Sequence, residues 1–598
     1  MSEQRYPPIA DYGFISDCHS AALVSRSGSI DWCCMPRMDH GSVFGRLLDW
    51  DRGGSCRIAP ADPHEVERRY LDDTLVLETT FRTDGGAVRL TDCFAMRRGG
   101  RTDPARQILR IVEGIEGSVE VSVHVSPRFE YGMAPPWIRP YGDGHWAAFG
   151  GDDGLVIAGD IRLEREDRVD LTARVRVAEG GRRRLSITHA EPEDIDDGVE
   201  EAVGVEELDR RLDDTVAWWR GWGEGGSKGV GRGPEAVLRS ALVLKGLTIA
   251  RTGAIAAAPT TSLPEVWGGT QNWDYRHSWV RDSTWAVRSL FELEHDREAD
   301  GFRRFMERTA AGGLGDINTI YGLGGEHFLA EIEVDMEGYR GARPVRIGNL
   351  ASTQAQHDVY GEMIQLAWEW HERGHEPEEH YWMFLRELVD VATEVWRRPD
   401  KGIWELRQQD QHYVHSKVMC WAAVDHGIRL AEGGGLEAPL DRWAEARDEI
   451  RRVVEEDGYD EERGVFVRVL SGSEVDGALL LLPRVGFVDY RDERMVRTAE
   501  AIHKDLQDGG LILRFLTRDR EGAFLPCSFW LAECLARQGK QDQAVEVFDR
   551  ACETANDLGL FSEEYDPDSD EMMGNFPQAL THLAHISAAL ALAGEPEA

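Results

Sequence analysis

From residue 12 to about residue 189, apolar and polar residues alternate in short runs, which is the period of β-strands. Two of these runs, 75–81 and 88–94, flank Thr83-Asp84-Gly85-Gly86, a sequence typical of a β-hairpin turn. Glycine-containing turns separate the other runs, and together they predict an antiparallel β-sandwich. The expected strands are 21–24, 30–33, 75–81, 88–94, 108–112, 119–125 and 171–177.

The pattern changes after Pro234, a residue that suits the first turn of a helix. From there almost to the end of the chain, apolar residues recur at helical spacing, which predicts an α/α toroid with helices paired in two concentric rings. The long loops 252–277 and 312–355 hold most of the polar and aromatic clusters, and loops of that length are usually functional. The expected helices are 234–251, 278–296, 299–311, 356–373, 378–396, 413–431, 438–456, 495–506, 524–538, 541–555 and 575–594.

Between these regions, the acidic stretch 191–201 ends the strand pattern, and a helical segment follows at 205–222. Trp218 and Trp222 lie four positions apart, on one helix face, and are expected to pack against a neighbouring domain. The glycine-rich run 223–229 indicates a linker. The predicted domains are therefore 1–200 (β-sandwich), 201–233 (helical linker) and 234–598 (helical domain).

The charge balance excludes several classes of partner. The chain has 108 acidic and 68 basic residues, for a formal net charge of −40, which disfavours binding to nucleic acid or to anionic membranes. No signal peptide or membrane-length apolar run is recognisable, and the nine cysteines show no paired metal spacing. We therefore expect a cytoplasmic protein with reduced thiols.

Candidate catalytic chemistry begins at Glu405, which lies between Trp404 and Arg407 in Gly402-Ile403-Trp404-Glu405-Leu406-Arg407. An apolar neighbour raises the pKa of a carboxylic acid, as a general acid requires near neutrality. A second acidic pair, Glu563-Glu564, lies far along the chain. Two acids from distant segments are what glycoside hydrolysis requires. Taken alone, each segment also fits ordinary packing with a solvated charge.

The densest cluster, 263–282, supplies candidate sugar contacts. The flat face of Trp273 suits the C–H side of a sugar ring, while Asp274, Arg281 and Asp282 suit its hydroxyls. The alternative is that the tryptophan belongs to the core and that Arg281-Asp282 is an internal ion pair. Arg514 lies in an apolar run and is expected to pair with a substrate hydroxyl or a catalytic carboxylate.

Cofactor chemistry finds no support in the sequence. His412 and His415 lie near Glu405, but neither a His-Glu-X-X-His motif nor a cysteine pair accompanies them. No Walker loop or Rossmann glycine fingerprint follows a strand. We therefore predict neither metal nor cofactor.

Several motifs in order resemble glycoside hydrolase family 15, the glucoamylase and bacterial or archaeal trehalase group. Ile9–Cys18 and Gly28–Trp32 resemble its trehalase-like N-terminal β-domain. Asn272–Arg276, Trp279–Asp282, Gly402–Glu405 and Gly574–Ala579 resemble its catalytic (α/α)6 barrel. The resemblance covers nearly the whole chain, so it implies an N-terminal antiparallel β-sandwich followed by an (α/α)6 barrel.

The resemblance also implies an inverting mechanism. Glu405 matches the general acid and Glu563 the general base, with Glu564 left open as the alternative base and otherwise expected to contact the substrate. Arg281 and Asp282 match the pair that grips sugar hydroxyls in the −1 subsite, and Arg514 matches a further arginine there. Trp404 and Arg407, beside the acid, are expected to contact the substrate as well. Inversion requires the two carboxyl groups to be ~6.5–9.5 Å apart, with room for one water.

The predicted function is hydrolysis of α-glucosides, glucoamylase-like on maltooligosaccharides, with hydrolysis of α,α-trehalose as the alternative. A disaccharide phosphorylase would need a basic phosphate pocket and no second acid, so Glu563 argues against it. A carbohydrate-binding protein without catalysis would not need both acids. The expected partner is a small oligosaccharide or disaccharide, and a homo-oligomer remains open.

Overall fold

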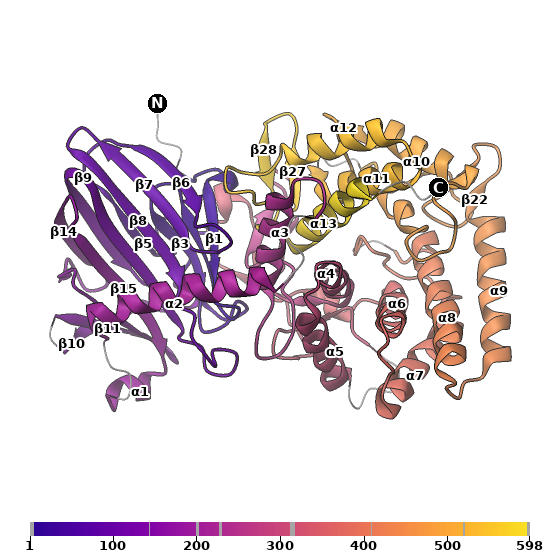
Figure 1. Cartoon of the computed structure of the whole chain (residues 1–598), viewed down its shortest axis with the longest axis horizontal. Helices are drawn as coiled ribbons and strands as arrows, with labels where there is room; N and C mark the ends of the chain where they lie inside the picture. Colours follow the sequence, from indigo (N-terminus) through magenta and orange to yellow (C-terminus); the bar gives the residue numbers. More distant parts are fainter. Residues whose placement is uncertain are drawn as a thin grey trace.

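The computed structural model describes residues 5–142, 144–198, 203–225, 230–310, 317–407, 409–517 and 521–594. It consists of a β-sandwich followed by an (α/α)6 barrel, as the sequence predicts (Figure 1). The sandwich, in indigo and purple, lies beside the helical domain, which runs from magenta to yellow. Helix α2 (Val205–Glu224) extends along the sandwich toward the first helices of the barrel.

The β-domain contains fifteen strands among the described residues, all antiparallel to their partners. The predicted hairpin is present, with Thr83 paired to Gly86 across its turn. The strands are β1 (Tyr12–Ser16), β2 (Ala21–Ser25), β3 (Ser29–Cys34), β4 (Ser42–Phe44), β5 (Ser55–Pro60), β6 (Glu65–Tyr70), β7 (Leu77–Thr83), β8 (Gly86–Phe94), β9 (Gln107–Ser126), β10 (Trp137–Tyr141), β11 (His145–Gly150), β12 (Asp153–Gly159), β13 (Glu164–Arg165), β14 (Leu171–Ala178) and β15 (Arg182–Ala190).

One strand joins the two layers of the sandwich and corrects the sequence prediction. The expected strands 108–112 and 119–125 are parts of a single strand, β9. Its first half pairs with β8 and β15, and its second half pairs with β5 and β14. Gly114 and Gly117 interrupt the apolar pattern where β9 bends: a Cβ atom at Gly114 would lie 2.0 Å from the carbonyl oxygen of Ala178, and Gly117 has φ +63°. Glycine is the residue that such a bend requires.

Each of the eleven predicted helices is present among the described residues, with ends shifted by a few positions. Helix α8 is buried along almost its whole length, as expected of a helix inside the toroid. The helices are α3 (Pro234–Leu247), α4 (Val280–Glu292), α5 (Asp296–Ala310), α6 (Asp358–Glu372), α7 (Glu379–Val395), α8 (Val414–Gly434), α9 (Leu440–Asp457), α10 (Glu493–Asp505), α11 (Leu525–Arg537), α12 (Gln541–Cys552) and α13 (Ala579–Ala593).

Short antiparallel strand pairs fix the loops between these helices. Three of these small sheets lie in segments that carry candidate site residues or adjoin them. They are β16 (Thr261–Pro264) with β17 (Asn272–Asp274), β18 (Ser278–Trp279) with β19 (Ile320–Tyr321), and the three-stranded sheet of β26 (Ala523–Phe524), β27 (Glu564–Asp566) and β28 (Glu571–Met573). No helix in the described ranges is both long and apolar enough to cross a membrane.

The two domains are tied together by polar contacts to the loop 252–277. The indole of Trp32, on β3, donates to the carbonyl oxygen of Pro259 at 2.7 Å. The Arg276 guanidinium donates to the Tyr131 hydroxyl at 2.8 Å and to the His40 carbonyl at 2.9 Å, both in the β-domain. The hydrogen bonds to Pro259 and Tyr131 are buried, and the one to His40 is partly buried. The β-domain therefore forms part of the support of this loop.

Helix α2 adds a second connection. The Trp222 ring stacks on His295 with centroids 4.0 Å apart, and its indole donates to Glu298 at 3.0 Å, so this face packs against the helical domain as predicted. Part of the predicted linker, 226–229, lies outside the described residues, as do residues 199–201 of the acidic stretch.

Candidate active site

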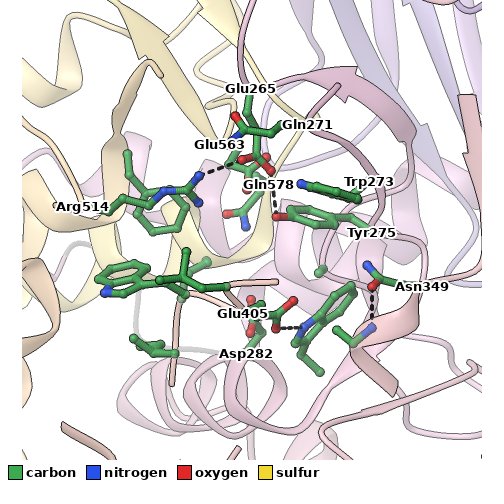
Figure 2. A pocket seen from close by; sticks show the side chains of 18 of the residues that line it. Glu265, Gln271, Trp273, Tyr275, Asp282, Asn349, Glu405, Arg514, Glu563 and Gln578 are labelled. Carbon is green, nitrogen blue, oxygen red and sulfur yellow. Dashed lines mark hydrogen bonds and ion pairs between the residues drawn. The ribbon is translucent and has the colours of Figure 1, made fainter. Parts of the chain in front are cut away.

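A cavity of about 320 Å³ lies among the loops of the barrel and is lined by both expected catalytic acids (Figure 2). Glu405 and Glu563 stand on opposite sides of it, although they are far apart in the sequence. The lining residues that bear on its chemistry are Glu265, Trp273, Tyr275, Trp279, Arg281, Asp282, Trp404, Glu405, Arg407, Arg514, Glu521 and Glu563.

Glu405 sits on a left-handed turn, with φ +55°, a conformation that non-glycine residues rarely adopt. Its carboxylate accepts a hydrogen bond from the indole of Trp279 at 2.6 Å, and the Arg281 guanidinium lies 3.7 Å away. Burial raises the pKa of Glu405, against the opposing effect of Arg281. A carboxylic acid in this state keeps its proton to higher pH, as a proton donor must.

Glu563 is 1% exposed and comes just before strand β27. Its Oε2 atom accepts a hydrogen bond from the Asn575 backbone at 3.3 Å. Burial raises the pKa of Glu563 well above the ordinary value, so its anion is a stronger base than an exposed carboxylate. Gly574 adjoins it: with φ +71°, a Cβ atom there would lie 2.5 Å from Glu563 Oε2.

The side chain of Glu564 points away from the cavity. Adjacent residues of an extended segment point to opposite sides. Glu564 does not line the cavity; it is fully buried behind the wall and accepts a hydrogen bond from the Gly522 backbone at 3.1 Å. Of the two alternatives for the base, Glu563 is the one at the cavity.

Arg514 is the centre of an acidic cluster on the Glu563 side (Figure 2). Its guanidinium lies 2.8 Å from Glu265 and 2.9 Å from Glu521, both at the cavity, and 3.9 Å from Glu564 behind it. Arg514 was expected to pair with a substrate hydroxyl or a catalytic carboxylate, and the structure instead pairs it with Glu265, Glu521 and Glu564. Its partners are other carboxylates than the candidate acid and base.

Arg281 and Asp282 open helix α4 and lie beneath Glu405. Their side chains are 3.3 Å apart, and Arg281 also lies 3.5 Å from the buried Asp358 of α6. Among the described residues, Asp282 Oδ2 has no hydrogen-bond partner. Its carboxylate therefore has capacity left for a sugar hydroxyl. Burial raises the pKa of Asp282, and Arg281 opposes that rise.

Comparison with known proteins agrees with this arrangement. Residues 231–590 match "Glycosyl hydrolases family 15", and residues 1–179 match "Trehalase-like, N-terminal". The chain belongs to glycoside hydrolase family 15. It is accordingly an O-glycosyl hydrolase.

Relatives of this family 15 enzyme extend over nearly its whole length. A trehalase of Mycobacterium tuberculosis is 36% identical, over 98% of this chain and 89% of the relative. A trehalase of Thermoplasma volcanium is 35% identical, over 98% and 94%. A solved bacterial glucoamylase in complex with acarbose superposes with a TM-score of 0.73 over 98% of this chain and 94% of that one. At 11% identity, the last similarity shows the fold alone.

Asp274, like Glu564, is an expected substrate contact that the family 15 fold does not bring to the cavity. On strand β17, Trp273 faces the cavity while Asp274 points to the opposite side. Asp274 is fully buried, makes a bidentate ion pair with Arg276 at 2.8 and 2.7 Å, and accepts from the Gly348 backbone at 3.0 Å. These contacts leave its carboxylate occupied by the protein.

Trp273 and Arg407 meet at the rim of the cavity. The Arg407 guanidinium lies 4.0 Å from the centre of the Trp273 ring, and that of Arg346 lies 4.4 Å from it. Glu331 accepts from Arg407 at 2.6 Å. Trp273 is therefore stacked with arginine in this structure. Trp404 lies deeper, donates to Asp476 at 2.7 Å, and packs near Trp530.

Several residues of this site were not selected from the sequence. Tyr275 and Glu265 belong to the densest polar and aromatic segment, which was the available signal, but nothing in the sequence showed which of its members face a cavity. Trp279 was expected from the sequence as a flat face for a sugar ring, and it lines the cavity. Glu521 gave no signal, because only folding brings it to Arg514.

The histidines near Glu405 do not form a ligand set. His415 is buried among protein atoms, and burial lowers its pKa to about 4. Within the described ranges, the group of possible ligands close enough to share an ion is Glu130, Asp152 and Asp153, in the β-domain. A second cavity, of about 600 Å³, lies between the domains and includes Trp222 and Lys245 in its wall.

Proposed function

We propose that this family 15 hydrolase cleaves α,α-trehalose to two glucose molecules, with inversion at one anomeric carbon. The observation that carries the proposal is full-length similarity to proteins named trehalase, at 34–36% identity for four of them. Maltooligosaccharides were the first expectation from the sequence, and the comparisons favour the trehalose alternative instead.

The size of the cavity supports a disaccharide. At about 320 Å³, it is at the small end of the ~300–1,000 Å³ range of small-molecule sites. The Arg407 and Glu331 ion pair and the stacked Trp273 ring bound it on one side. A long glucan would need a more extended groove on the leaving-group side.

The proposed reaction uses the two acids on opposite sides of the cavity. Glu405, protonated, donates its proton to the oxygen that bridges the two glucose units. Glu563, ionised, removes a proton from a water molecule that attacks the anomeric carbon from the other face. The bond to the bridging oxygen breaks, and the water oxygen becomes the new hydroxyl. One glucose is released as the β-anomer and the other as the α-anomer.

The neighbouring charges fit this reaction. Asp282 and Arg281 are placed to bind hydroxyls of the sugar that is attacked, and the carboxylate of Asp282 stabilises positive charge on its ring in the transition state. Among the described residues, the three arginines that line the cavity are each close to a carboxylate: Arg281 to Asp282, Arg407 to Glu331, and Arg514 to Glu265. A phosphorylase would need cationic groups to receive phosphate, so this pairing supports hydrolysis.

The nine cysteines are all unpaired, and eight are buried. This supports the proposal that the enzyme works in a reducing, cytoplasmic compartment.

Substrate choice is tested by incubating the purified chain separately with trehalose, maltose, isomaltose and starch, at low and high salt, with Glu405→Gln as the control for contaminating activity. We expect the highest kcat/KM with trehalose, and proton NMR of the first products should show equal α- and β-glucose. Faster release of glucose from maltose or starch would refute the trehalase proposal. Release of glucose 1-phosphate in phosphate buffer would refute hydrolysis.

A further inference from the structure

Glu265 is a buried acid at the cavity that the proposed reaction does not use. It follows strand β16 directly and is 2% exposed. One carboxylate oxygen lies 2.8 Å from the Arg514 guanidinium, and the other accepts from the Tyr275 hydroxyl at 3.4 Å (Figure 2). A buried carboxylate with two such partners is held in one place, so its position relative to the cavity is fixed.

Tyr275 connects Glu265 to the candidate base. The phenol that donates to Glu265 lines the same cavity as Glu563, and it opposes the rise in the pKa of the Glu563 carboxyl. A phenol has one hydrogen to donate, so it can serve only one of the two carboxylates at a time. The Tyr275 hydroxyl is therefore a donor that Glu265 and Glu563 can share.

The structure assigns Glu265 as a positioning residue for the base: it holds the Tyr275 hydroxyl and the Arg514 guanidinium in the wall of the cavity that Glu563 also lines. This inference rests on the proposed role of Glu563. While Glu563 is ionised, the phenol donates to it. Once Glu563 has taken the proton of the attacking water, the phenol turns to Glu265.

The electrostatics of the site support the same assignment. Burial is the main cause of the raised pKa of Glu563, and the carboxylate of Glu265 raises it further, whereas Tyr275 and Arg514 oppose the rise. The other charged groups on this side are Glu521 and Glu564, which also face Arg514. Glu521 contacts the same guanidinium as Glu265 but is not among the main influences on Glu563.

This difference provides a matched pair of variants. Glu265→Gln and Glu521→Gln each remove one carboxylate partner of Arg514, at 2.8 and 2.9 Å, but only Glu265→Gln also changes the environment of Tyr275 and Glu563. The measurement is the pH dependence of kcat/KM, whose acidic limb reports the ionisation of the base in the free enzyme. It is made with whichever α-glucoside the wild type hydrolyses fastest, so a wrong substrate assignment does not affect it.

We expect Glu265→Gln to move the acidic limb to lower pH, by clearly more than Glu521→Gln does, and to reduce kcat more than it changes KM. Tyr275→Phe removes a donor to Glu563 and should move the limb the opposite way, to higher pH. Glu265→Asp keeps the charge and should leave the limb near that of the wild type while kcat still falls. Circular dichroism spectra confirm that each variant is folded.

An unchanged acidic limb in Glu265→Gln, or equal shifts in Glu265→Gln and Glu521→Gln, would overturn the assignment. If Glu265→Gln does not fold, a limb that Tyr275→Phe leaves in place would overturn it equally. Failure of the proposed role of Glu563 has a different signature, because Glu563→Gln would then retain the activity and the acidic limb of the wild type, and failure of the trehalase proposal would appear in the substrate comparison instead.

Discussion

Replacing Asp274 by alanine separates a structural role from a substrate-binding one. The carboxylate of Asp274 and the guanidinium of Arg276 are both fully buried and joined by two hydrogen bonds. Removal of one member of such a pair leaves the other charge buried without its counter-ion, which costs about 3–5 kcal/mol. We expect Asp274→Ala to lower the free energy of unfolding by about that amount while the KM of the folded enzyme stays close to the wild-type value.

The assay combines a urea or thermal unfolding midpoint, followed by tryptophan fluorescence, with steady-state kinetics at a temperature where both proteins are folded. A double variant, Asp274→Ala with Arg276→Met, removes the stranded charge and should recover part of the lost stability. An unchanged midpoint together with a several-fold higher KM would refute the structural role.

The same variant has an expected pH signature. Although Asp274 is buried, Arg276 holds the pKa of its carboxyl below the usual range. A lowered pKa in the folded state contributes stability that is fully present above the unfolded value of about 3.9 and is lost as pH falls toward the folded value. The difference in stability between the wild type and Asp274→Ala should therefore be constant from about pH 5 to 8 and shrink below about pH 4.

Three further predictions concern the reaction. Glu405→Gln and Glu563→Gln should each lower kcat by several orders of magnitude with unfolding midpoints near that of the wild type, and near-normal turnover in both would end the assignment of the acids. The reaction needs Glu563 ionised and Glu405 protonated, so kcat/KM should fall both at low pH, as Glu563 is protonated, and at high pH, as Glu405 ionises. Because burial raises the pKa of both carboxyls, the fall at low pH should be centred above the ~4.3 of an ordinary glutamate. Full activity at about pH 4 would contradict this prediction. Gly574→Ala should reduce kcat by about 10²-fold, because the added Cβ atom would displace the Glu563 carboxylate. The control is Gly268→Ala, which has a similar φ of +70° but open space around it and should keep its activity. Equal losses of activity in the two variants would indicate backbone strain instead.

The helices of this chain were largely predictable, because apolar periodicity is a local signal, whereas the expected strands correspond to only six of the fifteen described strands of the β-domain: β2, β3, β7, β8, β9 and β14. The eleven helices α3–α13, which the described part of the barrel contains, were all expected from apolar spacing. The error at β9 arose because a local pattern cannot distinguish a glycine that ends a strand from one that bends it. Gly114 and Gly117 bend β9 without ending it, since the strand continues from one layer of the sandwich into the other.

The site was predictable to the extent that its chemistry is carried by motifs. Glu405, Arg281 and Asp282 were expected and line one cavity, and Glu563 joins them from a distant segment. Asp274 looked the same as its neighbours in the sequence, but strand alternation and the buried Arg276 decide its direction. Glu265 acquires its meaning only from Arg514, 249 positions away, and such a long-range pairing leaves no local trace. Glu521 lies seven positions from Arg514, but no periodic pattern indicates that the two side chains meet.

The contacts of Trp32 and Arg276 across the domain boundary limit which fragments of this protein can be isolated in an active form. A fragment starting near residue 230 would expose an indole-sized gap beside Pro259 and leave a guanidinium with two of its acceptors missing, directly behind the strand that carries Trp273. The β-domain is thus a structural support of the active-site loop in the helical domain. A truncated protein, or one with an exchanged domain, would have to keep Trp32 and Tyr131 to yield an active barrel.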